Sequence, residues 1–136
     1  DWKTHGPLEK SIAKALARYD GPAAVMSFDP HCMAAMADAA PSIARGLVAE
    51  RYTSPHEPAG LSARQRFMMR HPLSAFIAKP QSVNYDIRAL TAVTPWIWQQ
   101  VLQRPLLTWT VRSPEQARKA RRWADAIVFE GFRADR

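Results

Sequence analysis

Apolar positions along the chain follow two patterns in turn, one with the period of a helix and one with the short run of a buried strand. From Pro7 to Tyr19 the apolar side chains recur at intervals of three and four, the period of one helix face. After the breaker triplet Asp20-Gly21-Pro22, a short apolar run begins, as expected of a strand covered on both sides. The predicted strands are Ala23–Phe28, Ala44–Glu50, Gln81–Ile87, Leu106–Arg112 and Asp125–Phe129.

Helices are predicted between these strands, and two of them have strong start signals. Asp29 is followed by Pro30, which combines a side chain that accepts hydrogen bonds from first-turn amides with a proline at the first helical position. Ser113 to Gln116 has the capping-box arrangement. Pro72 must kink or divide its helical segment. The predicted helices are Pro7–Tyr19, Pro30–Ala39, Leu61–Ala78, one from Thr94 or Pro95 to Gln103, and one from Pro114 to about Trp123 with Ser113 as its N-cap, and the segment Arg51–Gly60 has the composition of a loop.

The alternation of strands and helices indicates the fold class. Strands that recur with helices between them form parallel βαβ units, whose sheet is buried by helices, rather than a sandwich or a bundle. The class is therefore α/β. The five predicted strands are too few to close the eight-stranded (β/α) barrel, so the sheet is either open or part of an incomplete barrel.

Composition sets limits on size and location. A chain of 136 residues with 47% hydrophobic residues is enough for one domain with one core, which we place at residues 1–136. Its longest apolar runs fall far short of the ~20 residues that cross a bilayer, so no membrane span is expected. The single cysteine, Cys32, fits a reducing compartment, and the cytoplasm is the default location. Because the first residue is Asp1 rather than methionine, we expect a cut or processed amino terminus.

The formal charge of +7 favours anionic partners without naming one. A nucleic-acid site would gather basic residues and aromatic stacking platforms on one face. Here the basic residues recur in the predicted amphipathic helices, where charged side chains normally form the solvated outer face. No nucleic-acid partner is expected.

The order of segments AVMSFDP, ARGLVAE, SVNYDI, LLTWTVR with SPEQARKA, and ADAIVFEGF resembles the second half of the bacterial glycerophosphodiester phosphodiesterase family. In that family a strand ending in Ser-Phe, a strand with Gly-Leu, a strand ending in Trp-Thr-Val and a final Asp-Gly-Ile-Ile strand occur in this order. The matching residues here include Ser27 and Phe28, and Trp109, Thr110 and Val111. The resemblance covers nearly all of the chain.

This resemblance implies a TIM-like barrel that hydrolyses glycerophosphodiesters to glycerol 3-phosphate and an alcohol. It also implies a divalent metal, Mg²⁺ or Ca²⁺, held by carboxylates, and two histidines for acid and base chemistry. Those groups lie in the first half of the family barrel, in His-Arg-Gly, Glu-x-Asp, His-Asp and Glu-Ile-Lys motifs that are absent here. We therefore expect a truncated, carboxyl-terminal part of one barrel domain, with no catalytic residue and no metal ligand of its own.

The substrate pocket is expected to include Ser27, Phe28, Trp109 and Glu130, each near the carboxyl end of a predicted strand, where barrel enzymes build their sites. Trp109 would stack on the alcohol or glycerol part of the substrate, although an ordinary core tryptophan would give the same sequence. Ser27 would donate to a phosphate oxygen, or it would turn the chain into the next helix. Glu130 departs from the family, whose last strand usually ends in Thr-Asp.

Other reactive residues are predicted to have structural roles. The four histidines, His5, His31, His56 and His71, have no two-ligand spacing and are predicted to lie on the surface. Cys32 is predicted to pack within a helix, because no histidine is placed to activate it.

Two alternatives to the enzyme remain open at this point. One is a non-catalytic binding module for an anionic ligand, which the charge permits. The other is a half-barrel that pairs with itself as a homo-oligomer to cover its exposed strand edges. An upstream segment with the His-Arg-Gly, Glu-x-Asp and Glu-Ile-Lys motifs would favour the enzyme, whose partner would be a small phosphodiester substrate.

Overall fold

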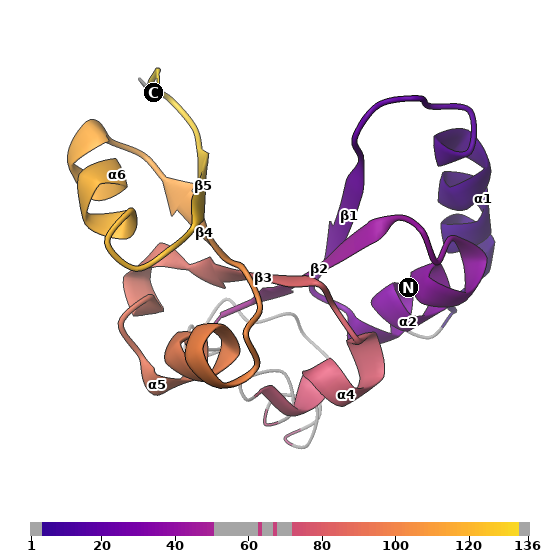
Figure 1. The fold of residues 1–136 in the computed structure, drawn as a ribbon, viewed down its shortest axis with the longest axis horizontal. Helices are drawn as coiled ribbons and strands as arrows, with labels where there is room; N and C mark the ends of the chain where they lie inside the picture. Colours follow the sequence, from indigo (N-terminus) through magenta and orange to yellow (C-terminus); the bar gives the residue numbers. More distant parts are fainter. Residues whose placement is uncertain (1–3, 51–62, 64–66, 68–71, 134–136) are drawn as a thin grey trace. The chain divides into compact units, whose positions relative to one another are not determined.

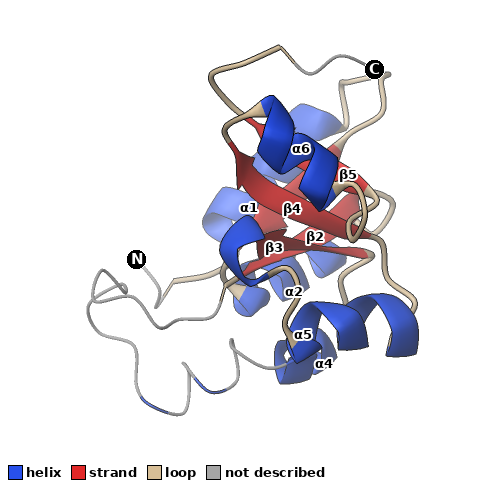
Figure 2. Ribbon diagram, turned by 90° about the vertical axis from the view of Figure 1, so that its left-hand side faces the viewer, coloured by secondary structure: helices blue, strands red, loops and turns tan. Residues whose placement is uncertain are grey.

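The structure is a computed structural model that describes residues 4–50, 63, 67 and 72–133 (Figure 1). The chain divides into two compact units: unit 1 comprises Asp1–Val48 with Leu73–Gln81, and unit 2 comprises Ala49–Pro72 with Ser82–Arg136. In both units parallel strands alternate with helices (Figure 2). This is the α/β class that the sequence predicts, with the parallel strands and flanking helices of a partial TIM-like barrel.

Unit 1 is built around a pair of parallel strands. Ala24 of the first strand lies beside Ala44 of the second, and the pairing continues to Ser27 beside Leu47. The buried methionines Met33 and Met36 come from the helix between these strands. The elements are α1 (Pro7–Leu16), β1 (Ala24–Ser27), α2 (Pro30–Ala39), β2 (Ala44–Ala49), η1 (Pro72–Ser74) and α4 (Ala75–Ala78), with the last residue of β2 and the first of η1 assigned to unit 2.

Backbone pairing in unit 1 extends beyond the strands. The Arg45 backbone N–H donates to Oε1 of Gln81 at 2.9 Å, and the Gln81 backbone N–H donates to the Arg45 carbonyl at 2.8 Å. Two reciprocal bonds, one of them through the glutamine side chain, therefore hold Gln81, which follows α4, against the start of β2.

The described part of unit 2 contains three parallel strands. Val83 pairs with Leu106, Asp86 pairs with Trp109, and Val111 pairs with Phe129 across a register shift in the middle strand. The elements are β3 (Ser82–Asp86), the 3₁₀ turn η2 (Ile87–Ala89), α5 (Val93–Trp96), the π-helical turn η3 (Ile97–Val101), β4 (Leu106–Val111), α6 (Pro114–Ala120) and β5 (Ala126–Phe129).

The two faces of β3 and β4 differ in burial. Val83, Tyr85, Leu106 and Thr108 lie on one face and are at most 1% exposed. Leu106 also lines a cavity of about 180 Å³ with Trp96 of α5 and Trp123, which identifies this face as the one covered by helices. The opposite face carries Asn84, Asp86, Leu107 and Trp109.

The predicted helix starts agree with the structure, whereas helix lengths do not. Asp29 caps α2 by accepting from the His31 backbone N–H at 2.8 Å, and Ser113 caps α6 by accepting from the Gln116 N–H at 3.2 Å. The Gln116 side chain, however, accepts from Arg112 at 2.7 Å, one residue before the position that a capping box uses.

The helices are shorter than their apolar periodicity suggests. α1 ends at Leu16 and α6 at Ala120, each followed by a turn, so the predicted ends at Tyr19 and Trp123 were wrong. The predicted helix Thr94–Gln103 divides into α5 and η3. Tyr19 and Trp123, which continue the apolar period past these helix ends, are 57% and 52% exposed, so the pattern does not mark a buried helix face there. Half of the predicted helix Leu61–Ala78 and all of the predicted loop Arg51–Gly60, with His56 and His71, lie outside the described residues. Among the described residues, no helix has the length and apolar character needed to cross a membrane.

Candidate functional site

Polar and aromatic side chains gather at the carboxyl ends of the strands in unit 2. Asp86 is the last residue of β3, Trp109 is its neighbour on β4, and Glu130 follows β5 directly. Parallel strands bring their carboxyl ends to the same edge of a sheet, so these three residues share one edge. This is the position that the sequence predicts for Trp109 and Glu130.

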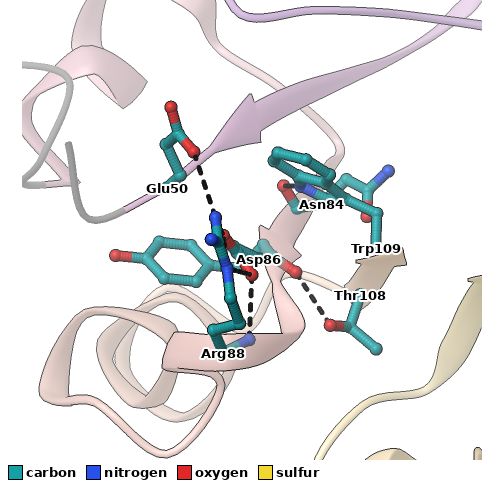
Figure 3. A network of polar contacts seen from close by, with 7 residues as sticks. Glu50, Asn84, Asp86, Arg88, Thr108 and Trp109 are labelled. Carbon is teal, nitrogen blue, oxygen red and sulfur yellow. Dashed lines mark hydrogen bonds and ion pairs between the residues drawn. The ribbon is translucent and has the colours of Figure 1, made fainter. Parts of the chain in front are cut away.

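Trp109 lies on the face of β4 that the helices do not cover. Its side chain is half-buried, and its indole N–H donates to the backbone carbonyl of Asn84 at 3.0 Å (Figure 3). The hydrogen bond fixes the ring along β3 while leaving part of it accessible. A tryptophan of the helix-covered core would instead have to lie on the face of Leu106 and Thr108.

A charged network, which sequence reasoning missed, adjoins this tryptophan. Asp86 is 5% exposed, and it accepts from the Arg88 backbone N–H at 2.8 Å and from the Arg88 Nε–H at 2.9 Å. The Arg88 guanidinium also contacts Asp86 through Nη2, and its distance from Glu50 is 4.0 Å (Figure 3). Hydrogen bonding to Asp86 raises the pKa of Arg88 above its already high value. The result is a permanent cation, 74% exposed, held in one place by a buried carboxylate.

Glu130 has a different partner. Its carboxylate accepts from Arg112 Nε at 2.6 Å, and its backbone N–H donates to the Val111 carbonyl at 3.0 Å. Both charged side chains are more than half exposed. The ion pair therefore contributes little to stability, and it places the Glu130 carboxylate beside Arg112 at the strand end.

In unit 1, Ser27 and Phe28 line a cavity of about 570 Å³ together with Met26, Asp29 and Cys32. Phe28 is 37% exposed. The Ser27 hydroxyl oxygen accepts from the Asp29 backbone N–H at 3.0 Å, which is the turn-forming role weighed against phosphate binding. The Ser27 side chain is also hydrogen-bonded to Cys32, so donation to a phosphate oxygen would require the hydroxyl hydrogen to change partner.

The same cavity borders a second polar cluster. His5 Nε2 and Asp29 Oδ2 are 2.8 Å apart, although His5 was predicted to be a surface residue without an orienting partner. Burial raises the pKa of the Cys32 thiol to about 12, with a hydrogen bond to Glu9 and the charge of Asp29 adding to the effect. The thiol is therefore protonated at neutral pH, and its hydrogen bond lowers the pKa of Glu9.

Sequence patterns gave little warning of these two clusters. The spacing of Asp86 and Arg88 at the end of a strand is a local signal that an N-cap analysis would find. His5 is 24 residues from Asp29, and a contact at that distance follows from the fold alone.

Comparisons with known proteins support the fold. The chain is similar to the crystal structure of a protein assigned as a glycerophosphoryl diester phosphodiesterase from Silicibacter pomeroyi DSS-3, with a TM-score of 0.65 and 23% identity. That match covers 90% of this chain and 40% of the other. A glycerophosphodiester phosphodiesterase from Parabacteroides distasonis ATCC 8503 matches with a TM-score of 0.57 and 14% identity, over 90% of this chain and 47% of the other.

No family model and no curated protein sequence matches the chain. At identities below one quarter, the structural likeness establishes the fold, and the chain spans less than half the length of the two solved structures. Both structural neighbours carry the family name that the order of sequence segments indicates.

Proposed function

We propose that this chain is the carboxyl-terminal part of a glycerophosphodiester phosphodiesterase and supplies walls of its substrate pocket. The reaction would hydrolyse a glycerophosphodiester to glycerol 3-phosphate and an alcohol. The observation that carries the proposal is the likeness to two solved phosphodiesterases over 90% of the chain, together with the order of the sequence segments.

The proposed roles of the pocket residues follow from their positions. Trp109 would pack against the alcohol or glycerol group, because its accessible ring lies at the carboxyl end of β4. Ser27 would donate its hydroxyl hydrogen to a phosphate oxygen in place of Cys32, and Phe28 would shape the apolar wall of the cavity. Glu130 would orient Arg112 or a substrate hydroxyl at the end of β5.

Arg88 is an addition to this set. Its exposed guanidinium lies at the strand edge and is anchored by Asp86. A fixed cation in this position suits the negative charge of a phosphodiester, since arginine pairs with phosphate oxygens through two parallel hydrogen bonds.

The divalent metal implied by the family does not fit the donors that converge in the described part of the chain. Those donors are the side chains of His5, Asp29 and Cys32. Mg²⁺ and Ca²⁺ prefer oxygen ligands, and a thiol is too soft for them. We therefore assign no step of the reaction to a metal bound by these residues.

Reconstitution tests the proposal. The chain would be assayed for glycerol 3-phosphate release from glycerophosphocholine, alone and mixed with a polypeptide carrying the His-Arg-Gly, Glu-x-Asp and Glu-Ile-Lys motifs, with Mg²⁺ or Ca²⁺ present. We expect no release by either piece alone and release by the mixture. Trp109→Ala should lower the activity of the mixture by about tenfold or more, because the substrate loses a positioning contact.

The matched control is Trp96→Ala, which removes a 56% exposed tryptophan from α5 on the helix-covered side. It should leave the activity of the mixture unchanged. Hydrolysis by the chain alone would contradict the proposal, as would a mixture that forms a complex and stays inactive.

A second candidate, binding of an anionic ligand without catalysis, is favoured by a separate observation in unit 2. A cavity of about 460 Å³ is lined by Arg88, Lys119 and Arg122 together with Trp123. Three basic groups around one cavity attract an anion. This candidate predicts that phosphate esters bind the chain alone and that Lys119→Gln and Arg122→Gln weaken binding, while the mixture described above hydrolyses nothing.

A further inference from the structure

Three side chains of types that can bind metals lie close together in unit 1, although their spacing in the sequence matches no metal-binding motif. His5 precedes α1, Asp29 is the N-cap of α2, and Cys32 lies in the first turn of α2. One donor atom from each, namely a ring nitrogen, a carboxylate oxygen and the sulfur, lies within 4.8 Å of the other two. The i, i+3 spacing of Asp29 and Cys32 brings both side chains to one side of the helix start, and the fold adds the histidine.

The carboxylate is oriented before any ligand arrives. One oxygen of Asp29 accepts from the His31 backbone N–H at 2.8 Å, which fixes the side chain as a helix cap. The other oxygen therefore points toward His5 Nε2, which lies 2.8 Å away. Asp29 is 7% exposed, so its direction is also restricted by packing.

A fourth acidic group adjoins the sulfur. Glu9 is 3% exposed, its carboxylate accepts from the Gly6 backbone N–H at 2.7 Å, and it is hydrogen-bonded to the Cys32 thiol. A buried carboxylate beside a thiol can accept the hydrogen bond of the neutral group or stabilise a bound cation.

This donor set has a chemical preference. Imidazole, carboxylate and thiolate together suit Zn²⁺, which binds nitrogen at roughly 2.0–2.1 Å, oxygen at roughly 2.0–2.2 Å and sulfur at about 2.3 Å. Ligands around a tetrahedral zinc ion are thus about 3.3–3.8 Å apart. The His5 Nε2–Asp29 Oδ2 distance of 2.8 Å is shorter than this range, so zinc binding requires that hydrogen bond to open by about 0.5 Å, and the 4.8 Å within which all three atoms lie is wider than the range.

We propose that this chain binds a zinc ion through His5, Asp29 and Cys32. On binding, the Cys32 sulfur forms a bond to zinc and its proton leaves to solvent, while the histidine binds as the neutral imidazole. The three residues leave one tetrahedral position open. The adjoining cavity of about 570 Å³, lined by Asp29 and Cys32, gives the ion a route of entry and room for a water molecule at that position. This site does not depend on the phosphodiesterase proposal.

Cobalt substitution tests the site without any enzyme assay. The chain, stripped with a chelator, would be titrated with Co²⁺ and with Zn²⁺, and absorption and heat of binding would be measured. We expect one ion per chain, a near-ultraviolet band from thiolate-to-cobalt charge transfer, and loss of that band when Zn²⁺ is added. Mg²⁺ should produce no competition, because it does not displace an ion bound through sulfur.

Variants locate the ion. Cys32→Ser should abolish the charge-transfer band, and His5→Gln should weaken Zn²⁺ binding at least tenfold, since even loss of an outer-shell partner costs about 10–100-fold. Asp38→Asn is the matched control, because it removes an exposed carboxylate from the same helix. Far-ultraviolet circular dichroism checks that each variant keeps its helices.

The wild-type chain provides the decisive result even if a variant fails to fold. A folded wild-type chain that shows no cobalt charge-transfer band overturns the proposal. A band that survives Cys32→Ser, or zinc affinity unchanged in His5→Gln, would place the ion at other residues and overturn it equally.

Discussion

An aspartate caps a helical turn in the same way in each unit, with a different side-chain partner. In unit 1, Asp29 follows β1 and accepts from the backbone N–H two residues later at 2.8 Å; in unit 2, Asp86 ends β3 and does the same at 2.8 Å. The second carboxylate oxygen of Asp29 contacts the imidazole of His5, which is distant in the sequence. The second oxygen of Asp86 accepts a hydrogen bond from the guanidinium of Arg88, the same residue whose backbone N–H it caps. The cap therefore depends on residues close in the sequence, whereas the chemical properties of each cluster depend on the side chain that contacts the aspartate.

The two aspartates differ in whether a ligand can replace their side-chain contact. Arginine stays charged at any ordinary pH, so the Asp86–Arg88 pair is a permanent feature that presents a cation. Histidine can bind as the neutral imidazole, and the neighbouring Cys32 can lose its proton to a metal, so the Asp29 cluster can open for a ligand. One cap therefore supports a fixed charge, and the other supports a candidate metal site.

The largest effect that tests this comparison is the reactivity of Cys32. At pH 8 a thiol with a pKa of 9.0 is about one-tenth ionised, whereas a pKa of about 12 leaves roughly one molecule in ten thousand as thiolate. Alkylation by iodoacetamide, in the presence of a chelator, should be about 1000-fold slower in the folded chain than in urea. Mass spectrometry over time measures both rates.

The raised pKa of Cys32 also predicts how the stability of the folded chain changes with pH. The folded state favours the neutral thiol, so its contribution is fully present below pH 9 and is lost as the pH rises toward about 12. Equal alkylation rates in the folded and unfolded chain would show that Cys32 is not held as a hydrogen-bonded thiol beside Glu9.

The next effect concerns the two caps. Asp86→Ala and Asp29→Ala each remove a cap, and each should lower the free energy of unfolding by about 1–2 kcal/mol in urea denaturation. Asparagine retains the capping oxygen, so Asp29→Asn should recover most of this loss, while Asp86→Asn leaves Arg88 without its carboxylate and should recover less. Equal recovery at both positions would remove the distinction between the two clusters.

More of the fold than of the Asp29 and Asp86 clusters could be predicted from the sequence. Strands such as Leu106–Val111 and the starts of α2 and α6 depend on composition and neighbours within a few residues, which the sequence displays directly. The burial of both faces of β3, including Asn84 and Asp86, contrasts with its alternating apolar pattern, because packing in three dimensions covers the polar side as well. Contacts such as His5 with Asp29 depend on the fold and have no local signal.

A moderate effect on self-association is expected from a substitution in β5, an edge strand among the described strands of unit 2. Among the described strands of this unit, β5 pairs with β4 on one side, and its residues Val128 and Phe129 are 39% and 45% exposed. An apolar edge strand of this kind invites pairing with a second copy, which is how we propose that a homo-oligomer would form. Val128→Lys should therefore weaken self-association by about tenfold, since edge lysines oppose strand pairing. Sedimentation over a concentration series measures it, with Val93→Lys on α5 as the exposed control.

The smallest effect on stability should come from Glu130→Gln, and this variant separates structural from pocket roles. The ion pair of Glu130 with Arg112 is 2.6 Å long but more than half exposed on both sides, so its loss should change the free energy of unfolding by less than about 1 kcal/mol. If Glu130 is part of the substrate pocket, the same variant should still lower hydrolysis by the reconstituted mixture, because the pocket loses a charge held at the strand end. Glu115→Gln removes a comparable exposed ion pair, to Lys119 at 3.1 Å on α6, and should leave hydrolysis unchanged. Equal activity of both variants would exclude Glu130 from the pocket while leaving the fold and the other strand-end residues in place.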